Sequence, residues 1–63
     1  MFIIKVVGYN KMCYVGKDHR PCKDINDARL FKTRQIAGGY IVKNWTNWNM
    51  IKDGSCTMTV QEL

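Results

Sequence analysis

The chain has 63 residues, of which 46% are hydrophobic and 24% charged, as is typical of one folded domain and too apolar for a disordered chain. So short a chain buries only about 60% of its unfolded surface, which leaves little room for a deep catalytic cleft. Ten Lys and Arg against five Asp and Glu give a net charge of +5, which suits an acidic protein surface or nucleic acid as partner. A basic, solvated surface without a partner has the same composition. We expect residues 1–63 to form a single small domain that is not an enzyme.

The cysteines and the apolar start of the chain indicate a cytoplasmic setting. Cys13, Cys22 and Cys56 are odd in number, and thiols of this kind are usually buried and reduced in the cytosol. Residues 1–4 are apolar, but Lys5 follows and no signal-peptide cleavage site is recognisable. No run reaches the roughly 18 apolar residues of a membrane span. We therefore expect a cytoplasmic protein that does not associate with a membrane.

Two short strands are predicted at the start of the chain. Residues 2–7 alternate between two faces and are rich in β-branched side chains, which favours a strand that is at least half buried. Residues 8–11 contain a Gly and an Asn, which tolerate the positive φ of a turn, and residues 12–16 return as a second strand. The polar residues 17–24 hold the only proline and are predicted to be an exposed loop.

A short segment is predicted to lead from this loop to a helix. Residues 25–31 are expected to be extended or turned and to bring Leu30 and Phe31 to the core. Thr33 is a good N-cap, because its hydroxyl accepts a hydrogen bond from an otherwise unpaired N–H in the first helical turn.

The helix itself is predicted from apolar residues that recur on one face, namely Ile36, Ala37, Tyr40 and Ile41. We expect it to end at Asn44 or Trp45. Gly38 and Gly39 fall on its outward side, where each costs about 1 kcal/mol relative to Ala. The pair either weakens the helix or lets another molecule approach its backbone closely.

The end of the chain is predicted to be a hairpin. Residues 48–51 form its first strand, and Asp53-Gly54 within residues 52–55 is a strong turn signal. Residues 56–61 then alternate between apolar and polar side chains. The predicted fold is α+β, with a small antiparallel sheet in ββαββ order and one helix packed on one face.

No constellation of residues predicts catalysis, a cofactor or a metal site. His19 and Cys22 are spaced as H-x-x-C, but the paired C-x-x-C knuckles that usually mark a zinc site are missing. A thiol- or metal-dependent activity around these two residues is the least favoured hypothesis. Gly38-Gly39 lacks the pattern of a phosphate-binding loop and falls inside a helix rather than before one.

Basic and aromatic side chains are the best candidates for function. Six cations fall within eighteen residues: Lys17, Arg20, Lys23, Arg29, Lys32 and Arg34. If the loop and the start of the helix meet in space, these residues form a cationic edge where phosphate or carboxylate groups bind well. Trp45 and Trp48 lie beside uncharged residues, and one of them suits an anchor in a protein interface while the other caps the core.

Nucleic acid is the alternative partner for the same cations. The two Trp, with Tyr9 and Tyr14, would supply stacking surfaces for a single strand. No helix-turn-helix, RNP or GXXG motif is present. Salt dependence distinguishes the two classes of partner, because phosphate-driven binding falls steeply with salt.

The central segment resembles a class of very short proteins encoded among the accessory genes of phages of Gram-positive bacteria. The matching pieces are Tyr14-Val15-Gly16-Lys17, Asp27-Ala28-Arg29-Leu30-Phe31-Lys32-Thr33, Ala37 and Tyr40-Ile41. The chain departs from the class in lacking acidic residues after Thr33 and in placing glycines in the helix. The resemblance implies an accessory protein that binds and inhibits or redirects a host protein, including a defence or nucleic-acid-processing factor, and it brings no catalytic residues.

These observations favour a non-enzymatic protein that binds a host protein through the six cations and a Trp anchor. A small basic nucleic-acid-binding module is the alternative. The exposed strand edges of so small a sheet suit either a monomer or a homodimer.

Overall fold

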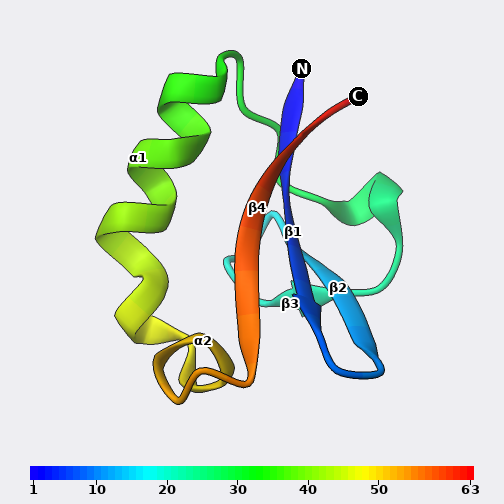
Figure 1. Cartoon of the computed structure of the whole chain (residues 1–63). Helices are drawn as coiled ribbons and strands as arrows, with labels where there is room; N and C mark the ends of the chain where they lie inside the picture. Colours follow the sequence, from blue (N-terminus) through cyan, green and yellow to red (C-terminus); the bar gives the residue numbers. More distant parts are fainter.

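The computed structural model describes residues 1–63, and Figure 1 shows a four-stranded antiparallel sheet with the helices beside it. The order in the sheet is β3-β2-β1-β4. The strands are β1 (Phe2–Gly8), β2 (Lys11–Val15), β3 (Pro21–Cys22) and β4 (Cys56–Glu62). The helices are α1 (Arg34–Asn44), α2 (Asn49–Lys52) and two short 3₁₀ turns, η1 (Ile25–Asp27) and η2 (Trp45–Asn47). The predicted α+β class, with a small antiparallel sheet and one main helix, is confirmed, and the ββαββ order holds roughly.

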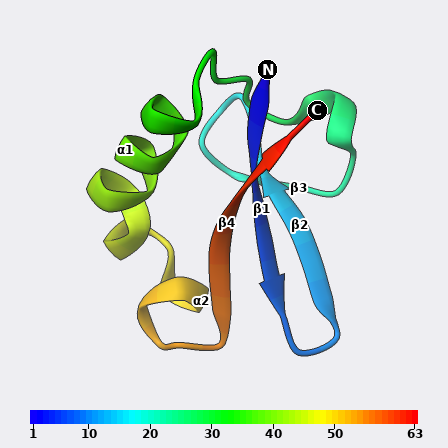
Figure 2. The ribbon, with the colours of Figure 1, turned by 45° about the horizontal axis from the view of Figure 1, so that its top comes forward.

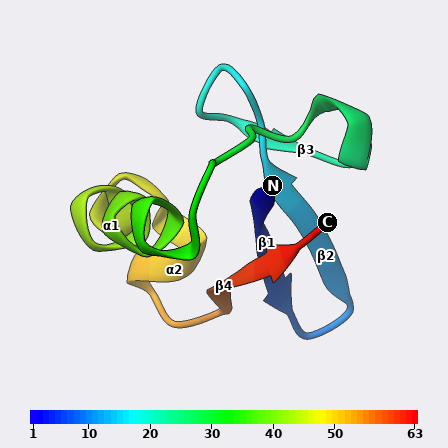
Figure 3. The ribbon, with the colours of Figure 1, turned by 90° about the horizontal axis from the view of Figure 1, so that it is seen from above.

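Viewed from above, α1 and α2 lie on one side of the sheet (Figure 3). The strand residues that face them alternate, as in Ile4 and Val6 of β1, because successive side chains of a strand point to opposite faces. The core on this side is built from Ile4, Val6, Val15, Phe31, Ala37, Trp48 and Cys56. A smaller cluster on the opposite face joins Ile3, Tyr14 and Ala28.

Residues 28–31, which we call the wedge segment, fill the space between the start of β1 and the end of β2. Phe2 and Phe31 exchange two backbone hydrogen bonds of 2.8 Å each, and the Arg29 N–H donates to the Val15 carbonyl at 2.8 Å. Phe31 is buried as predicted. The prediction for Leu30 is wrong, because this side chain is 51% exposed: alternate residues of an extended segment point to opposite sides.

The predicted cap and end of α1 are both confirmed. The Thr33 Oγ1 accepts a hydrogen bond of 3.1 Å from the Ile36 N–H, and the helix ends at Asn44. Ala37 is fully buried under the helix, but Ile36 is 54% exposed. Its expected place in the core is therefore wrong: in a helix neighbouring residues are turned by about 100°, so a short helix that buries Ala37 turns Ile36 toward the solvent side.

The predicted terminal hairpin is wrong in its first strand. Residues 49–52 form α2, and β4 pairs along its whole length with β1, which lies between β2 and β4 (Figure 2). Burial of Trp48 against the helix side of the sheet explains the difference, because it places α2 over that face instead of beside β4. The Asp53-Gly54 turn is confirmed, with Gly54 at φ 83°, but it joins α2 to β4.

The fourth strand comes instead from the segment predicted to be a loop. Pro21 and Cys22 pair with Val15 and Tyr14 of β2 and form the short strand β3. A two-residue strand carries no periodicity that sequence reasoning detects.

Gly38→Ala is expected to raise the free energy of unfolding by about 0.5–1 kcal/mol. A Cβ at this position meets no atom within 4 Å, and its φ is not positive, so only the gain in helix propensity remains. Urea denaturation followed by circular dichroism measures the change. A loss of stability would contradict the open surroundings of this glycine.

Candidate functional site

A groove of about 480 Å³ lies between the wedge segment and the outer side of α1. It combines cations with exposed apolar side chains, and we call it the cationic groove. Its lining residues are Arg29, Leu30, Phe31, Lys32, Ile36, Gly39, Tyr40, Lys43 and Asn44. Two of the six predicted cations, Arg29 and Lys32, therefore come together here with a third, Lys43, that sequence reasoning missed.

The wedge segment fixes the position of Arg29 at one side of the groove. The Arg29 backbone is held by its bond to Val15, and the Nη1 donates to the Lys17 carbonyl at 3.2 Å. The guanidinium carbon lies 6.0 Å from the centre of the Phe31 ring, a distance at which a cation is attracted to a ring face. Arg29 is thus oriented before any partner arrives, which lowers the entropy lost on binding.

Tyr40 connects the groove to the loop between β2 and β3. Its ring packs edge-on against Phe31 at 5.4 Å and stacks on His19 at 5.6 Å, and its hydroxyl lies 2.9 Å from the His19 Nδ1. Burial raises the pKa of the Tyr40 hydroxyl, and Arg29 partly opposes this shift. The phenol is therefore neutral at physiological pH and serves as a structural clamp between the loop and α1.

The groove combines apolar side chains with charge of one sign. Leu30 and Ile36 are exposed, and no Asp or Glu lines the groove. Three carboxylates lie instead around Cys22, where they add to burial in raising the pKa of its thiol; they are Asp27, Asp18 and Asp24. This separation leaves the positive potential of the groove without a local carboxylate to offset it.

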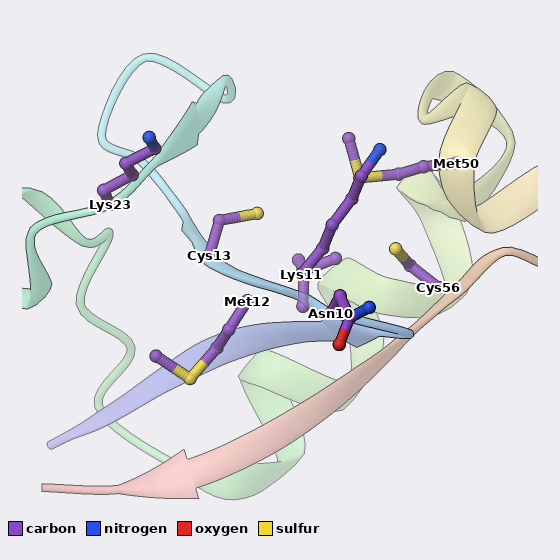
Figure 4. Close-up of a pocket in the computed structure, with 8 residues that line it drawn as sticks. Asn10, Lys11, Met12, Cys13, Lys23, Met50 and Cys56 are labelled. Carbon is purple, nitrogen blue, oxygen red and sulfur yellow. The ribbon is translucent and has the colours of Figure 1, made fainter.

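The other predicted cations are spread over the surface. Lys17 lines a hollow together with Asp18 and Asp27. Lys23 borders a different groove, which is lined by Cys13, Met50 and Cys56 among others (Figure 4). Arg20 lies in a hollow beside Trp48, and Arg34 lies over the Phe2 ring at 5.2 Å. The loop and the helix do meet, but at His19 and Tyr40, so the six cations do not form one edge.

The two tryptophans have different environments. Trp48 is 7% exposed and belongs to the core, whereas Trp45 is 43% exposed at the end of α1. Of the two predicted anchors, only Trp45 offers an open surface, and it does not line the cationic groove.

A second groove, also of about 480 Å³, lies on the helix side of the sheet beyond α2. Cys13 and Cys56 turn their sulfur atoms into it, and Met50 reaches it from α2 (Figure 4). Burial raises the pKa of the Cys13 thiol, and Cys56 and Cys22 raise it further. A raised pKa keeps the thiol protonated and weakens it as a nucleophile.

Nothing in the surroundings of His19 and Cys22 brings them together as a reactive pair. The His19 ring is engaged by Tyr40, while the Cys22 Sγ lies 3.5 Å from the Asp24 carbonyl. No group of three or more His, Cys, Asp or Glu side chains is placed to hold a metal ion.

Sequence reasoning missed most of the cationic groove because Leu30 and Ile36 were assigned to the core. The available signal is the spacing of Ile36, Gly39, Tyr40 and Lys43, which recur at three- and four-residue steps on one helix face.

Comparison with protein-family models, with curated proteins and with solved structures finds no match for this chain. None of its helices has both the length and the apolar character needed to span a membrane.

Trp48→Ala is expected to lower the free energy of unfolding by about 3–5 kcal/mol, because it removes a large core side chain. Trp45→Ala, which removes a side chain that is 43% exposed, is expected to lower the free energy of unfolding by less than about 1 kcal/mol. Urea denaturation of both variants tests this pair of values. Equal losses would contradict the assignment of Trp48 to the core and Trp45 to the surface.

Proposed function

We propose that this chain is a non-enzymatic binding protein whose cationic groove docks a segment of a protein partner that carries both acidic and apolar side chains. The observation that carries the proposal is that exposed Leu30 and Ile36 line the same groove as three cations, with no acidic residue in the lining; the cations are Arg29, Lys32 and Lys43.

The two kinds of side chain contribute differently to such a complex. Full burial of a Leu or Ile side chain contributes about 1.5–3 kcal/mol. An exposed ion pair contributes only about 0.2–1 kcal/mol, so the apolar contacts supply most of the affinity. The three cations guide the encounter and fix the orientation of the partner, and they disfavour a segment rich in Lys or Arg.

The glycine at the base of the groove supports close approach by the partner. Gly39 lines the groove, and no atom lies within 4 Å of the place where its Cβ would be. The surface of α1 is therefore open at Gly39, which suits close approach by a partner backbone. Gly38, one position earlier, does not line the groove.

The identity of the partner rests on the resemblance of residues 14–41 to phage accessory proteins. A host protein as partner, a cytoplasmic location and inhibition or redirection of that host protein stay predictions. The charge and the exposed apolar side chains of the groove support a partner segment in which carboxylates are spaced around one or two apolar side chains.

The proposal is tested by selecting a randomised peptide library against the immobilised protein. We expect the enriched peptides to combine Asp or Glu with Leu, Ile, Phe or Met. Against an enriched peptide, the double variant Lys32→Glu/Lys43→Glu is expected to bind at least about tenfold more weakly in fluorescence anisotropy, equivalent to about 1.4 kcal/mol.

The control is Lys11→Glu/Lys52→Glu, which changes the net charge equally at two exposed lysines outside the groove. It is expected to change the affinity less than about twofold. Equal weakening by both double variants would show that only net charge matters, and selection of peptides without acidic residues would contradict the proposed partner chemistry.

Nucleic acid remains the second candidate, because Tyr9 is 90% exposed and the three groove cations offer phosphate contacts. For a single strand held by three phosphate contacts, the logarithm of the affinity is expected to fall with the logarithm of salt with a slope of about −2. Titration with a labelled oligonucleotide at two salt concentrations measures it. Absence of binding at low salt would rule out this candidate.

A further inference from the structure

The two edge strands of the sheet, β3 and β4, differ in length and in composition. At one edge, β3 has only two residues and begins with Pro21, which removes a hydrogen-bond donor. At the other edge, β4 runs for seven residues and pairs with β1 without interruption from Cys56 to Glu62. Short strands, prolines, lysines and bulges protect edges from pairing with another chain. β3 has two of these features, and β4 has none of them.

The pairing of β4 with β1 determines which backbone groups of β4 point outward from the sheet. The Leu63 N–H donates to the Met1 carbonyl, while Phe2 bonds to Phe31 on the other side of β1. In an antiparallel pair, bonding and non-bonding positions alternate, so Thr57, Thr59 and Gln61 of β4 bond to β1. The intervening residues turn their N–H and C=O groups outward.

Met58 and Val60 are therefore the central outward-bonding residues of this edge. The backbone N–H and C=O groups of these two residues form no hydrogen bond with a turn, a loop or a helix cap. Their side chains are half-buried against the core, and those of Thr57 and Thr59 are exposed on the opposite face of the sheet. The edge is thus rich in β-branched and apolar residues, and Glu62 is its only charged residue.

We infer that β4 pairs with β4 of a second copy of this chain, antiparallel about a two-fold axis, to give one continuous eight-stranded sheet. An axis at Thr59 places Met58 opposite Val60 of the second copy, so that the outward-bonding residues meet each other. Two such pairs exchange two backbone bonds each. The same axis places Thr59 against Thr59 and Thr57 against Gln61, which are uncharged, self-complementary contacts.

The net charge of +5 does not prevent a second copy from pairing at this edge, because the nearest strand cations are far enough apart to be screened. The nearest strand cation is Lys5, which pairs with Thr59 one strand inward. In the dimer the two Lys5 residues are three strand spacings apart, about 14 Å, which is longer than the screening length of about 8 Å at physiological salt. The cationic groove lies on the outer side of α1 and is not part of this edge.

Amide hydrogen exchange, followed by NMR over a dilution series of the whole chain, tests the inference. The amides of Met58 and Val60 are expected to be protected at high concentration and to exchange freely on dilution. The amides of Thr57 and Thr59 bond to β1 and stay protected throughout, which makes them the internal control. Free exchange of Met58 and Val60 at every concentration, whatever the oligomeric state, would overturn the inference.

A second measurement uses Thr59→Lys, which places two like charges at the axis on an exposed position. The wild-type protein is expected to sediment at twice the 7.3 kDa mass of one chain. The variant is expected to dimerise at least tenfold more weakly with an unchanged circular dichroism spectrum. Thr46→Lys, at an exposed threonine in η2, is the matched control and is expected to dimerise like the wild type. A wild-type monomer, or equal dimerisation of all three proteins, would overturn the inference.

Discussion

The arrangement depends most on how the wedge segment is held between β1 and β2. Two backbone hydrogen bonds join Phe2 to Phe31, and a third joins Arg29 to Val15, so the chain leaves the sheet at a fixed place and direction. Phe31 then enters the core under Tyr40 and Ala37. Burial of one Phe contributes about 1.5–3 kcal/mol, which is substantial in a domain whose total stability is of order 5–15 kcal/mol. α1 starts three residues later, at Arg34, and has little freedom in where it lies.

The same constraint produces the cationic groove. An extended segment that buries Phe31 must turn its neighbours Leu30 and Lys32 outward, because side chains alternate along it. A helix that buries Ala37 must likewise expose Ile36 and present Lys43 on the same side. The groove therefore follows from the burial of Phe31 and Ala37 beneath it. The contact of Tyr40 with His19 ties the β2–β3 loop to α1 beside the groove.

Local signals in the sequence were sufficient for most of the fold. Alternation predicted the first two strands, and the Thr33 hydroxyl predicted the start of α1. Two features depended on long-range contacts that periodicity does not encode. Residues 48–51 are predicted to be a strand, but Trp48 is buried in the core and residues 49–52 form α2. The strand β3 exists only because β2 offers it an edge. Of the residues that line the groove, the sequence predicts only Arg29 and Lys32 as partner-binding residues. Leu30 and Ile36 are exposed because Phe31 and Ala37 fill the core beneath them, and this depends on long-range packing.

We propose that a partner binds in the cationic groove. This is tested most directly by mapping amide chemical shifts of the labelled protein during titration with a selected acidic and apolar peptide. We expect the shifts to be concentrated in the residues that line the groove, which are 29–32 of the wedge segment and 36, 39, 40, 43 and 44 of α1. Shifts confined to β4, or to the residues around Cys13 and Met50 that line the other groove, would contradict it.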